Sequence, residues 1–369
     1  MRSSHFGRLL ALGMAIPSFV ACSSAGQDND SAPSSASHES SLINAPIDTA
    51  HPFEVGVCTG VLNTDPAKGE VGACVGTASS RCSGSLVAPN LVLTARHCVH
   101  QGIEQTPFCN SYLTTNPAKP GGVRVSTDPS IKVGGPRFIE VSRIVVAEGN
   151  NGCDDDVALL VLSQNINDVE PAWVDLHRNL VSHPPADGKA AVVGRGVIDR
   201  AYDPVTHKLV RNDDGDLKRR VLTNVPFIGA GVGYAIPDFE QPNNELPSTE
   251  GIFLIGRSTL SGDSGCGVFL NDNFATKPTL IGVHSAGGFG LDGESSGSLN
   301  VRLDRHRAWI VSAALQAARE GNYTAPSWAS TVSTCSSAGG TCRKSQCSAG
   351  ERSDSDLRCG IDAACCVPQ

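Results

Sequence analysis

The sequence predicts a mostly β protein. Short segments rich in Val, Ile and Leu alternate with turn residues over most of the 369 positions, a pattern typical of strands. The chain contains 39 glycines and 22 prolines, which favour turns and interrupt helices. One stretch, 308–319, has the apolar spacing of a helix. With 40% hydrophobic residues, the chain can build one large domain or two small ones.

Charge and cysteine content exclude several classes of protein. The formal charge of −8 gives no indication of the positively charged surface that binds nucleic acid, so we expect no nucleic-acid partner. Fourteen cysteines are too many for a reducing cytosol unless they bind metal, and no paired C-x-x-C motifs with zinc spacing occur. We therefore expect disulfides, an oxidising compartment and no metal site.

The N-terminal segment has the form of an export signal. Basic residues flank an apolar run at 9–16 that is too short to span a bilayer. Small residues then precede Cys22, and a Ser- and Asp-rich stretch follows it. This arrangement resembles a bacterial lipoprotein signal with Cys22 as the lipid-bearing residue and a membrane tether as the result. The alternative is a plain signal peptide cut after Ala21 or Ala25, which would release a secreted protein.

The signal at 1–21 leads into a segment, 22–41, that we expect to be a flexible tether. Ser, Ala, Asp, Asn and Gln dominate it, and it has almost no large apolar side chain that could be buried. Two further segments, 100–125 and 200–217, are rich in Pro, Asn and Asp and are predicted to be long surface loops.

Three segments that could carry chemistry occur in a fixed order along the chain. They are TARHC at 94–98, DVALL at 156–160 and GDSG at 262–265. A serine hydroxyl is a poor nucleophile at neutral pH, so it needs an imidazole to take its proton. That imidazole needs a buried carboxylate to fix its tautomer. The order His, Asp, Ser differs from that of subtilisins and α/β-hydrolases. These segments resemble the trypsin/chymotrypsin family of serine endopeptidases.

Other segments strengthen this resemblance. They are CSGSLV at 82–87, LVLTARHC at 91–98, AVVGRG at 191–196, LIGVHSAGG at 280–288, VRL at 301–303 and WI at 309–310. The resemblance implies a trypsin-like protease domain over 42–320. It would consist of two six-stranded antiparallel β-barrels, at 42–180 and 190–305, with the active site in the cleft between them. We expect the helix at 308–319 to pack on the second barrel.

The resemblance also implies a function. It predicts an exported endopeptidase that hydrolyses peptide bonds of protein or peptide substrates through an acyl-enzyme, without a cofactor. One alternative is a catalytically silent homologue that serves as a binding or adhesion protein, and another is an esterase-like acyl transferase. The presence of all three catalytic residue types argues against a silent homologue.

Each catalytic role falls on a particular residue through the resemblance. Ser264 would be the nucleophile, and His97 would be the general base and then the general acid. The backbone N–H groups of Gly262 and Ser264 would form the oxyanion hole. Ten histidines occur in the chain, but only His97 lies in the TARHC setting.

Three consecutive aspartates compete for the role of orienting carboxylate. The apolar run begins directly after Asp156, which favours it as the last polar residue before a buried strand. Its neighbours Asp154 and Asp155 are then expected to belong to a solvated acidic loop.

The specificity positions follow from the same resemblance. Ser258 matches the base of the primary specificity pocket, and a serine there does not attract Arg or Lys as a carboxylate would. Gly287 and Ser298 match the pocket walls, and open walls would admit a large apolar side chain. Asp292 and Glu294 follow nearby and could restore a preference for basic side chains.

The strand 280–288 matches the family's docking site for the substrate backbone. Ser285 lies in this strand and is predicted to bind substrate. His284 lies in the same strand and is expected to form part of the wall of the substrate site. In the family, a freed amino terminus turns inward and pairs with the aspartate before the catalytic serine. Here Leu42 would be that terminus and Asp263 its partner. Ser41 stands where the family usually has a basic residue before the cut.

The cysteines of the protease region are odd in number. Cys82 and Cys98 match the family's histidine-loop disulfide. Loop position suggests two further pairs, Cys58–Cys74 and Cys109–Cys153. Cys266 then remains as a buried free thiol that fills apolar space.

The C-terminal part differs in composition. Residues 321–334 are rich in Ser, Thr, Ala and Pro and are predicted to be a linker. A disulfide-stapled module at 335–369 follows, with a cysteine spacing that resembles β-defensin-type and other small cystine-rich folds. Its six cysteines are Cys335, Cys342, Cys347, Cys359, Cys365 and Cys366. It is either a binding module for an unknown ligand or a stabilising tail.

Overall fold

The chain consists of two units, Met1–His38 and Glu39–Gln369. All of the described residues belong to the second unit. The computed structural model describes residues 42, 45–75, 79–99, 118–147, 149, 151–202, 209–213, 215–237, 245–256, 258–259, 262–289, 295–330, 335, 340–343, 347–358 and 364–368. The predicted signal at 1–21 and the whole predicted tether at 22–41, which includes the lipidation site Cys22, lie outside these residues. In the described part of the chain, no helix is both long and apolar enough to cross a membrane.

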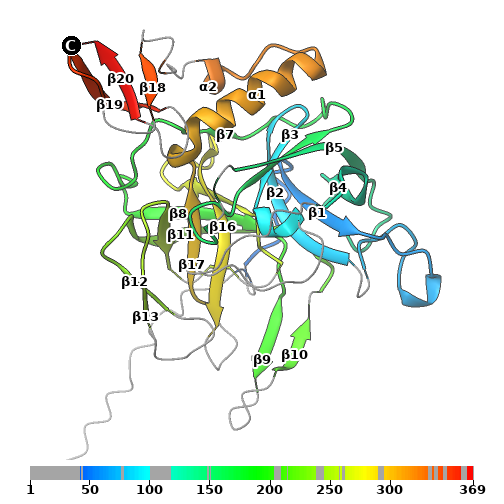
Figure 1. Ribbon diagram of the computed structural model, residues 1–369. Coiled ribbons are helices and arrows are strands. Elements are labelled where there is room, and N and C mark those ends of the chain that lie inside the picture. The colour runs from blue at the N-terminus through cyan, green and yellow to red at the C-terminus, as the bar shows by residue number, and fades with distance from the viewer. Residues whose placement is uncertain are drawn as a thin grey trace, which may run out of the picture. The chain divides into compact units, whose positions relative to one another are not determined.

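The first half of the protease region forms a closed antiparallel barrel (Figure 1). In barrel order its strands are β1 (Glu54–Gly60), β2 (Ser79–Ala88), β3 (Leu91–Thr94), β6 (Ala158–Leu162), β5 (Ile139–Val146) and β4 (Val123–Ser126). All residues of β3 and β6 are buried, in keeping with their nearly continuous apolar sequences. The two strands pair with Leu91 opposite Val161 and Thr94 opposite Ala158, which brings the residues that flank them to one end of the barrel.

The second barrel also has six antiparallel strands. They are β15 (Gly267–Leu270), β8 (Lys189–Gly194), β11 (Arg220–Ala230), β14 (Ile252–Ile255), β17 (Ser295–Arg302) and β16 (Thr279–Phe289), and β16 pairs again with β15. A short strand, β7 (Trp173–Val174), adds to β16 in parallel. A Cβ atom at Gly282 would collide with the buried ring of Phe253, so the absence of a side chain makes room for that ring. The predicted fold of two six-stranded barrels is confirmed.

The two predicted loops contain regular structure. Strands β9 (Asp199–Tyr202) and β10 (Leu209–Asp213) form a two-stranded sheet within the predicted loop 200–217. Strand β4 and a 3-10 turn, η4 (Pro120–Gly122), occupy the end of the predicted loop 100–125. The loop predictions were therefore wrong at these positions, because composition reports polarity and does not report whether a polar segment finds a strand partner. Elsewhere, η2 (Pro66–Lys68) is a short turn, and β12 (Ala235–Pro237) pairs with β13 (Glu245–Pro247).

The long helix α1 (Arg307–Gly321) follows the turn η5 (Leu303–His306) and matches the predicted stretch 308–319. It ends at Asn322, which adopts a left-handed conformation and bonds its amide back to the last turn.

The prediction that α1 packs on the second barrel was wrong. Asn90 donates its side-chain amide to the Ala317 carbonyl over 3.1 Å, and Arg143 forms an ion pair with Glu320. Asn90 and Arg143 both belong to the first barrel region. Mostly small side chains on one face of α1 allow the helix to lie close to the first barrel. They are Ile310, Ala313, Ala314 and Ala317.

The first barrel also receives the segment that follows α1. The Tyr323 hydroxyl donates to Asn90 Oδ1 over 2.7 Å, and the indole of Trp328 donates to the Val87 carbonyl over 3.3 Å. Trp328 lies in a short helix, α2 (Ser327–Ser330), and is buried. Part of the segment predicted to be a linker is thus attached to the protease core.

The C-terminal residues form three disulfide-bonded strands. They are β18 (Thr341–Arg343), β20 (Ala364–Pro368) and β19 (Glu351–Arg358), in that spatial order. Disulfides join Cys335 to Cys365 and Cys347 to Cys366. Cys342 is disulfide-bonded as well.

Candidate active site

The end of the first barrel brings His97 and Asp156 together. His97 lies in the turn η3 (Arg96–Val99) shortly after β3, and Asp156 lies shortly before β6, the strand that pairs with β3. One carboxylate oxygen accepts the backbone N–H of His97 at 2.8 Å, and the other lies 2.7 Å from His97 Nδ1. This two-point contact fixes the ring and keeps a proton on Nδ1, so Nε2 is left as the basic nitrogen.

Burial and hydrogen bonding set the charges of this pair. Asp156 is fully buried and also accepts a hydrogen bond of 2.6 Å from the Ser285 hydroxyl. Burial alone would raise the pKa of Asp156, but the contacts with His97 and Ser285 outweigh it and lower the pKa. Burial alone would lower the pKa of His97, but the Asp156 carboxylate outweighs it and raises the pKa. The pair therefore favours a charged carboxylate beside a more basic imidazole.

The two neighbouring aspartates have structural contacts instead. Asp154 accepts the Gly251 amide at 2.9 Å, and Asp155 accepts the Asn151 amide at 2.8 Å. Asp155 is buried, and burial raises its pKa. The expectation of a solvated acidic loop was wrong, because the backbone folds back on both carboxylates.

The serine segment is held between the two barrels. The Ser264 carbonyl accepts the amide of Ser83 in β2 at 2.8 Å, and the Gly265 amide donates to the carbonyl of His284 in β16 at 2.8 Å. Gly262 and Gly265 have φ angles of +94° and +84°. A Cβ atom at Gly265 would collide with the Ser83 carbonyl, so the turn requires glycine there.

Ser264 and His97 border the same disulfide. Cys98 Sγ lies 3.6 Å from the Ser264 carbonyl oxygen and 3.8 Å from His97 Nε2. Among the described residues, no hydrogen bond joins the Ser264 hydroxyl to His97. The structure thus brings the Ser264 segment to His97 without a formed hydrogen bond, as is common for such pairs before a substrate binds.

Two backbone donors beside Ser264 are available. Within the described ranges, the N–H groups of Gly262 and Ser264 donate to no acceptor of the protein. Unpaired N–H groups on a tight turn are the donors from which an oxyanion hole is built.

Comparison with known proteins agrees with this geometry. A family model described as Trypsin matches residues 61–218, which cover most of the first barrel and the start of the second. Residues 61–218 are thus similar to the trypsin family of serine proteases. It is also 28% identical over 227 residues to "Serine protease Hayan" of Drosophila melanogaster. That alignment covers 58% of this chain and 31% of the length of the Drosophila protein.

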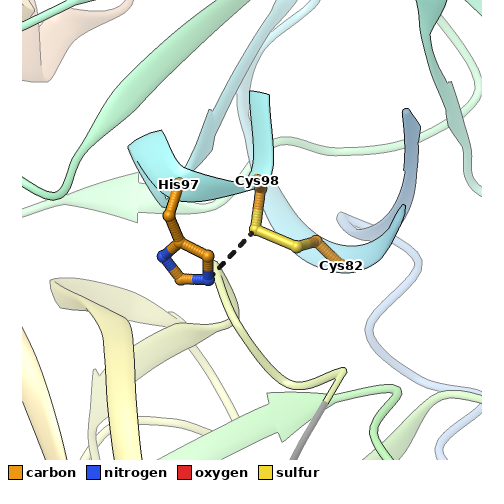
Figure 2. A group of neighbouring side chains, drawn as sticks. All are labelled: Cys82, His97 and Cys98. Carbon is orange, nitrogen blue, oxygen red and sulfur yellow. Dashed lines mark hydrogen bonds between the residues drawn. A yellow bond between two sulfur atoms is a disulfide. The ribbon is translucent and has the colours of Figure 1, made fainter. Parts of the chain in front are cut away.

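A disulfide lies next to the His97 ring. Figure 2 shows the His97 ring with one nitrogen directed at the sulfur of Cys98, which is bonded to Cys82. The three ligand atoms lie within 4.8 Å of one another, a spacing that could hold a metal ion. Because both sulfurs are consumed in the disulfide, neither is a thiolate, and the group does not fit a metal.

Other cysteines have the following positions. Cys58 and Cys74 form a disulfide. Cys153 is disulfide-bonded, and its predicted partner, Cys109, lies outside the described residues. Cys266 is a buried free thiol, and burial raises its pKa well above the usual range. A thiol with a raised pKa beside Ser264 is not a competing nucleophile.

The predicted activation partners lie close to each other. Asp263 is fully buried and accepts the Gly196 amide at 2.6 Å. The Leu42 side chain is buried, and its amide donates to the Ser258 carbonyl at 2.9 Å. A Cβ atom at Gly194 would collide with Asp263 Oδ1 and come within 3.1 Å of Leu42 Cδ1, so both residues border the same glycine.

Ser258, the predicted base of the specificity pocket, lies among buried polar side chains. Thr259 is the one of these side chains that the sequence analysis did not identify. The Ser258 hydroxyl lies 2.7 Å from that of Ser298, as the predicted wall and base positions suggest. Thr259 contacts Ser298 through its hydroxyl and lies 3.3 Å from His284 Nδ1. Gly287 lies against Thr259, since a Cβ atom there would be 3.2 Å from the Thr259 carbonyl. Asp292 and Glu294 lie outside the described residues.

Sequence reasoning also missed a buried acid that supports the serine segment. Glu54 in β1 accepts the Ser85 hydroxyl at 2.7 Å and the Gly267 amide at 3.2 Å. Burial raises the pKa of Glu54 well above its usual range. Its backbone carbonyl accepts from Arg195 at 3.1 Å and from Arg219 at 3.2 Å. The available signal was a lone charged residue within an otherwise apolar strand.

Proposed function

We propose that this protein is a serine endopeptidase that hydrolyses peptide bonds of protein or peptide substrates through an acyl-enzyme. The observation that carries the proposal is the double contact of His97 with the buried Asp156, beside the Ser264 turn. A surface histidine gains nothing from two hydrogen bonds to a fully buried carboxylate, whereas a general base needs both its tautomer and its direction fixed.

The residues would act in this order. His97 Nε2 removes the proton of the Ser264 hydroxyl as its oxygen attacks the substrate carbonyl, and Asp156 stabilises the imidazolium that forms. The N–H groups of Gly262 and Ser264 receive the negative oxygen of the tetrahedral intermediate. His97 then gives its proton to the leaving amine, and the same steps with water release the acid product from Ser264.

We also propose the family's mode of activation. A chain cut before Leu42 would have an ammonium group at that position, and Asp263 is the buried carboxylate near it. Pairing of the two charges would order the loop that presents Gly262 and Ser264.

Export remains part of the proposal and depends on the sequence of residues 1–22. The expected locations are the cell envelope, through a lipid on Cys22, or the surroundings of the cell. Mass analysis of the mature protein distinguishes them: a diacylglyceryl group on Cys22 supports the envelope form, and an unmodified chain that begins later supports secretion.

A fluorophosphonate probe tests the enzymatic proposal, because it reacts only with an activated serine. We expect labelling of the protein cut before Leu42, and no labelling of the same form of Ser264→Ala. Ser182→Ala, a change of an exposed serine, serves as the control and should be labelled as the unaltered protein is. Absence of labelling in both the intact and the cut protein would favour the silent homologue instead.

A further inference from the structure

The carboxyl group of Glu54 lies where the first barrel meets the segment that follows Ser264. Glu54 begins strand β1 and is fully buried. One of its oxygens accepts the amide of Gly267 at 3.2 Å, and the other accepts the hydroxyl of Ser85 at 2.7 Å. Ser85 lies in β2 of the first barrel, whereas Gly267 begins β15 of the second barrel shortly after Ser264. A single side chain thus joins the two barrels beside the proposed nucleophile.

The three strands are arranged for this contact. Glu54 stands directly opposite Ser85 in the pairing of β1 with β2, so the two side chains lie on the same face of the sheet. A Cβ atom at Gly267 would collide with the Ser85 hydroxyl. The absence of a side chain at Gly267 therefore lets its backbone approach the Glu54 carboxyl and the Ser85 hydroxyl together.

Another residue of β2 holds the serine turn itself. Ser83 donates its amide to the Ser264 carbonyl at 2.8 Å and its hydroxyl to the Gly262 carbonyl at 3.3 Å. Ser83 and Ser85 lie on one face of β2, because alternate residues of a strand point to the same side. The first barrel therefore holds the serine segment within its turn through Ser83 and after its turn through Glu54.

This attachment bears on the reaction because the catalytic groups come from different barrels. His97 and Asp156 flank strands of the first barrel, whereas the serine segment leads into β15 of the second. Proton transfer needs the hydroxyl within hydrogen-bond reach of the imidazole, and a displacement of about 1 Å can lower a rate about a hundredfold. We propose that Glu54 is a positioning residue that fixes the Ser264 turn relative to His97 by holding the Gly267 amide. The inference rests on the proposed endopeptidase activity.

The proposed role requires the length of the Glu54 side chain more than its charge. Arg195 and Arg219 donate to the backbone carbonyl of Glu54 at 3.1 and 3.2 Å, and a substitution of the side chain leaves these bonds in place. A glutamine at this position can accept the Gly267 amide and donate to Ser85, since a hydroxyl both donates and accepts. An aspartate keeps the charge but is one methylene shorter, so it cannot reach both partners from the same backbone.

Peptide hydrolysis by Glu54→Gln and Glu54→Asp tests the proposal, with the probe-reactive form of the full chain as the reference. In Glu54→Asp the serine turn loses its attachment after Ser264, so kcat should fall about ten- to hundredfold with little change in KM. Glu54→Gln keeps both hydrogen bonds and should retain kcat within about threefold. A loss of kcat in Glu54→Gln that equals or exceeds the loss in Glu54→Asp would refute the inference, and so would an unchanged kcat in both variants.

A control variant, Asn90→Ala, separates positioning from stability. Asn90 is also a buried polar side chain with two hydrogen-bond partners, Ala317 and Tyr323, but it precedes β3 whereas His97 follows that strand. Asn90→Ala should lower the melting temperature and keep kcat when both variants are assayed well below their melting temperatures.

Equal losses of kcat in Asn90→Ala and Glu54→Asp would assign the effect to stability and refute the inference. The fluorophosphonate probe keeps this result apart from the proposed function. If the unaltered protein reacts with the probe, only the role of Glu54 is at stake in these comparisons. If no form of the unaltered protein reacts, the proposed function fails, and the inference fails with it.

Discussion

At the scale of single residues, the contact between His97 and Asp156 is the feature that the sequence predicted best. The onset of an apolar run marked Asp156 among three aspartates, and the structure gives this carboxylate both hydrogen bonds to His97. The contact between Thr259 and His284 was not predicted, because hydroxyls and imidazoles occur in many settings and the sequence does not give their mutual distances.

The role of Asp156 leads to a first prediction. An amide cannot hold the Nδ1 proton of His97 as a carboxylate does, so Asp156→Asn favours the wrong tautomer. We expect kcat on a peptide substrate to fall about ten-thousandfold with little change in KM. Asp155→Asn should reduce kcat far less, since Asp155 binds the Asn151 amide and not His97. A comparable loss of kcat in both variants would contradict the assignment.

The raised pKa of His97 predicts the pH dependence of the reaction. The general base must be neutral, so kcat/KM should increase as pH rises through the pKa of His97. Because Asp156 raises this pKa above the ordinary value of 6.5, the midpoint of the acidic limb should lie above pH 6.5. A pH profile of kcat/KM measures it. In Asp156→Asn the midpoint should move to lower pH, and an unchanged midpoint would show that another group controls the limb.

At the scale of elements, apolar runs identified the buried strands, whereas contacts between distant elements were harder to predict. The runs at 91–94 and 158–162 became fully buried neighbours, and the helix was placed within two residues of its observed bounds. The face on which α1 packs was missed because it depends on Asn90 and Arg143, far away in the chain. The strands β9 and β10 were missed since each is short and polar.

The turn that carries Ser264 allows a prediction at this scale. Gly265 has a left-handed φ, and a Cβ atom there would collide with the Ser83 carbonyl. Gly265→Ala should therefore strain the turn by about 1–3 kcal/mol and displace Ser264 from His97. We expect Gly265→Ala to have a lower melting temperature and to react more slowly with the fluorophosphonate probe. Gly121→Ala, at a glycine of η4 with open space around it, is the control and should change neither quantity.

At the scale of the whole domain, buried charges connect the two barrels. Arg195, which follows β8, donates to the Pro129 carbonyl at 2.8 Å and to the Asp128 carbonyl at 2.8 Å. Arg219, which precedes β11, forms an ion pair of 2.9 Å with Asp48. These two guanidinium groups belong to the second barrel region, and they donate hydrogen bonds to backbone carbonyls of the first. Sequence reasoning could not find them, because their partners are mostly carbonyl groups, which every residue carries.

The Arg219–Asp48 ion pair should contribute measurably to the stability of the domain. Both side chains are at most 3% exposed, so removal of Arg219 takes the guanidinium partner from a buried carboxylate and leaves it only His51 and two backbone amides. Arg219→Met should lower the free energy of unfolding by about 3–5 kcal/mol, because breaking a buried ion pair is costly. Arg219 also donates to the Glu54 carbonyl. Part of this loss of stability therefore comes from that contact between the two barrels and not from the ion pair with Asp48. Denaturant unfolding of Arg219→Met, Asp48→Asn and the double variant separates the two contributions. If the pair matters, the double variant loses less than the sum of the single losses; strictly additive losses would assign the stability to the carbonyl contacts alone.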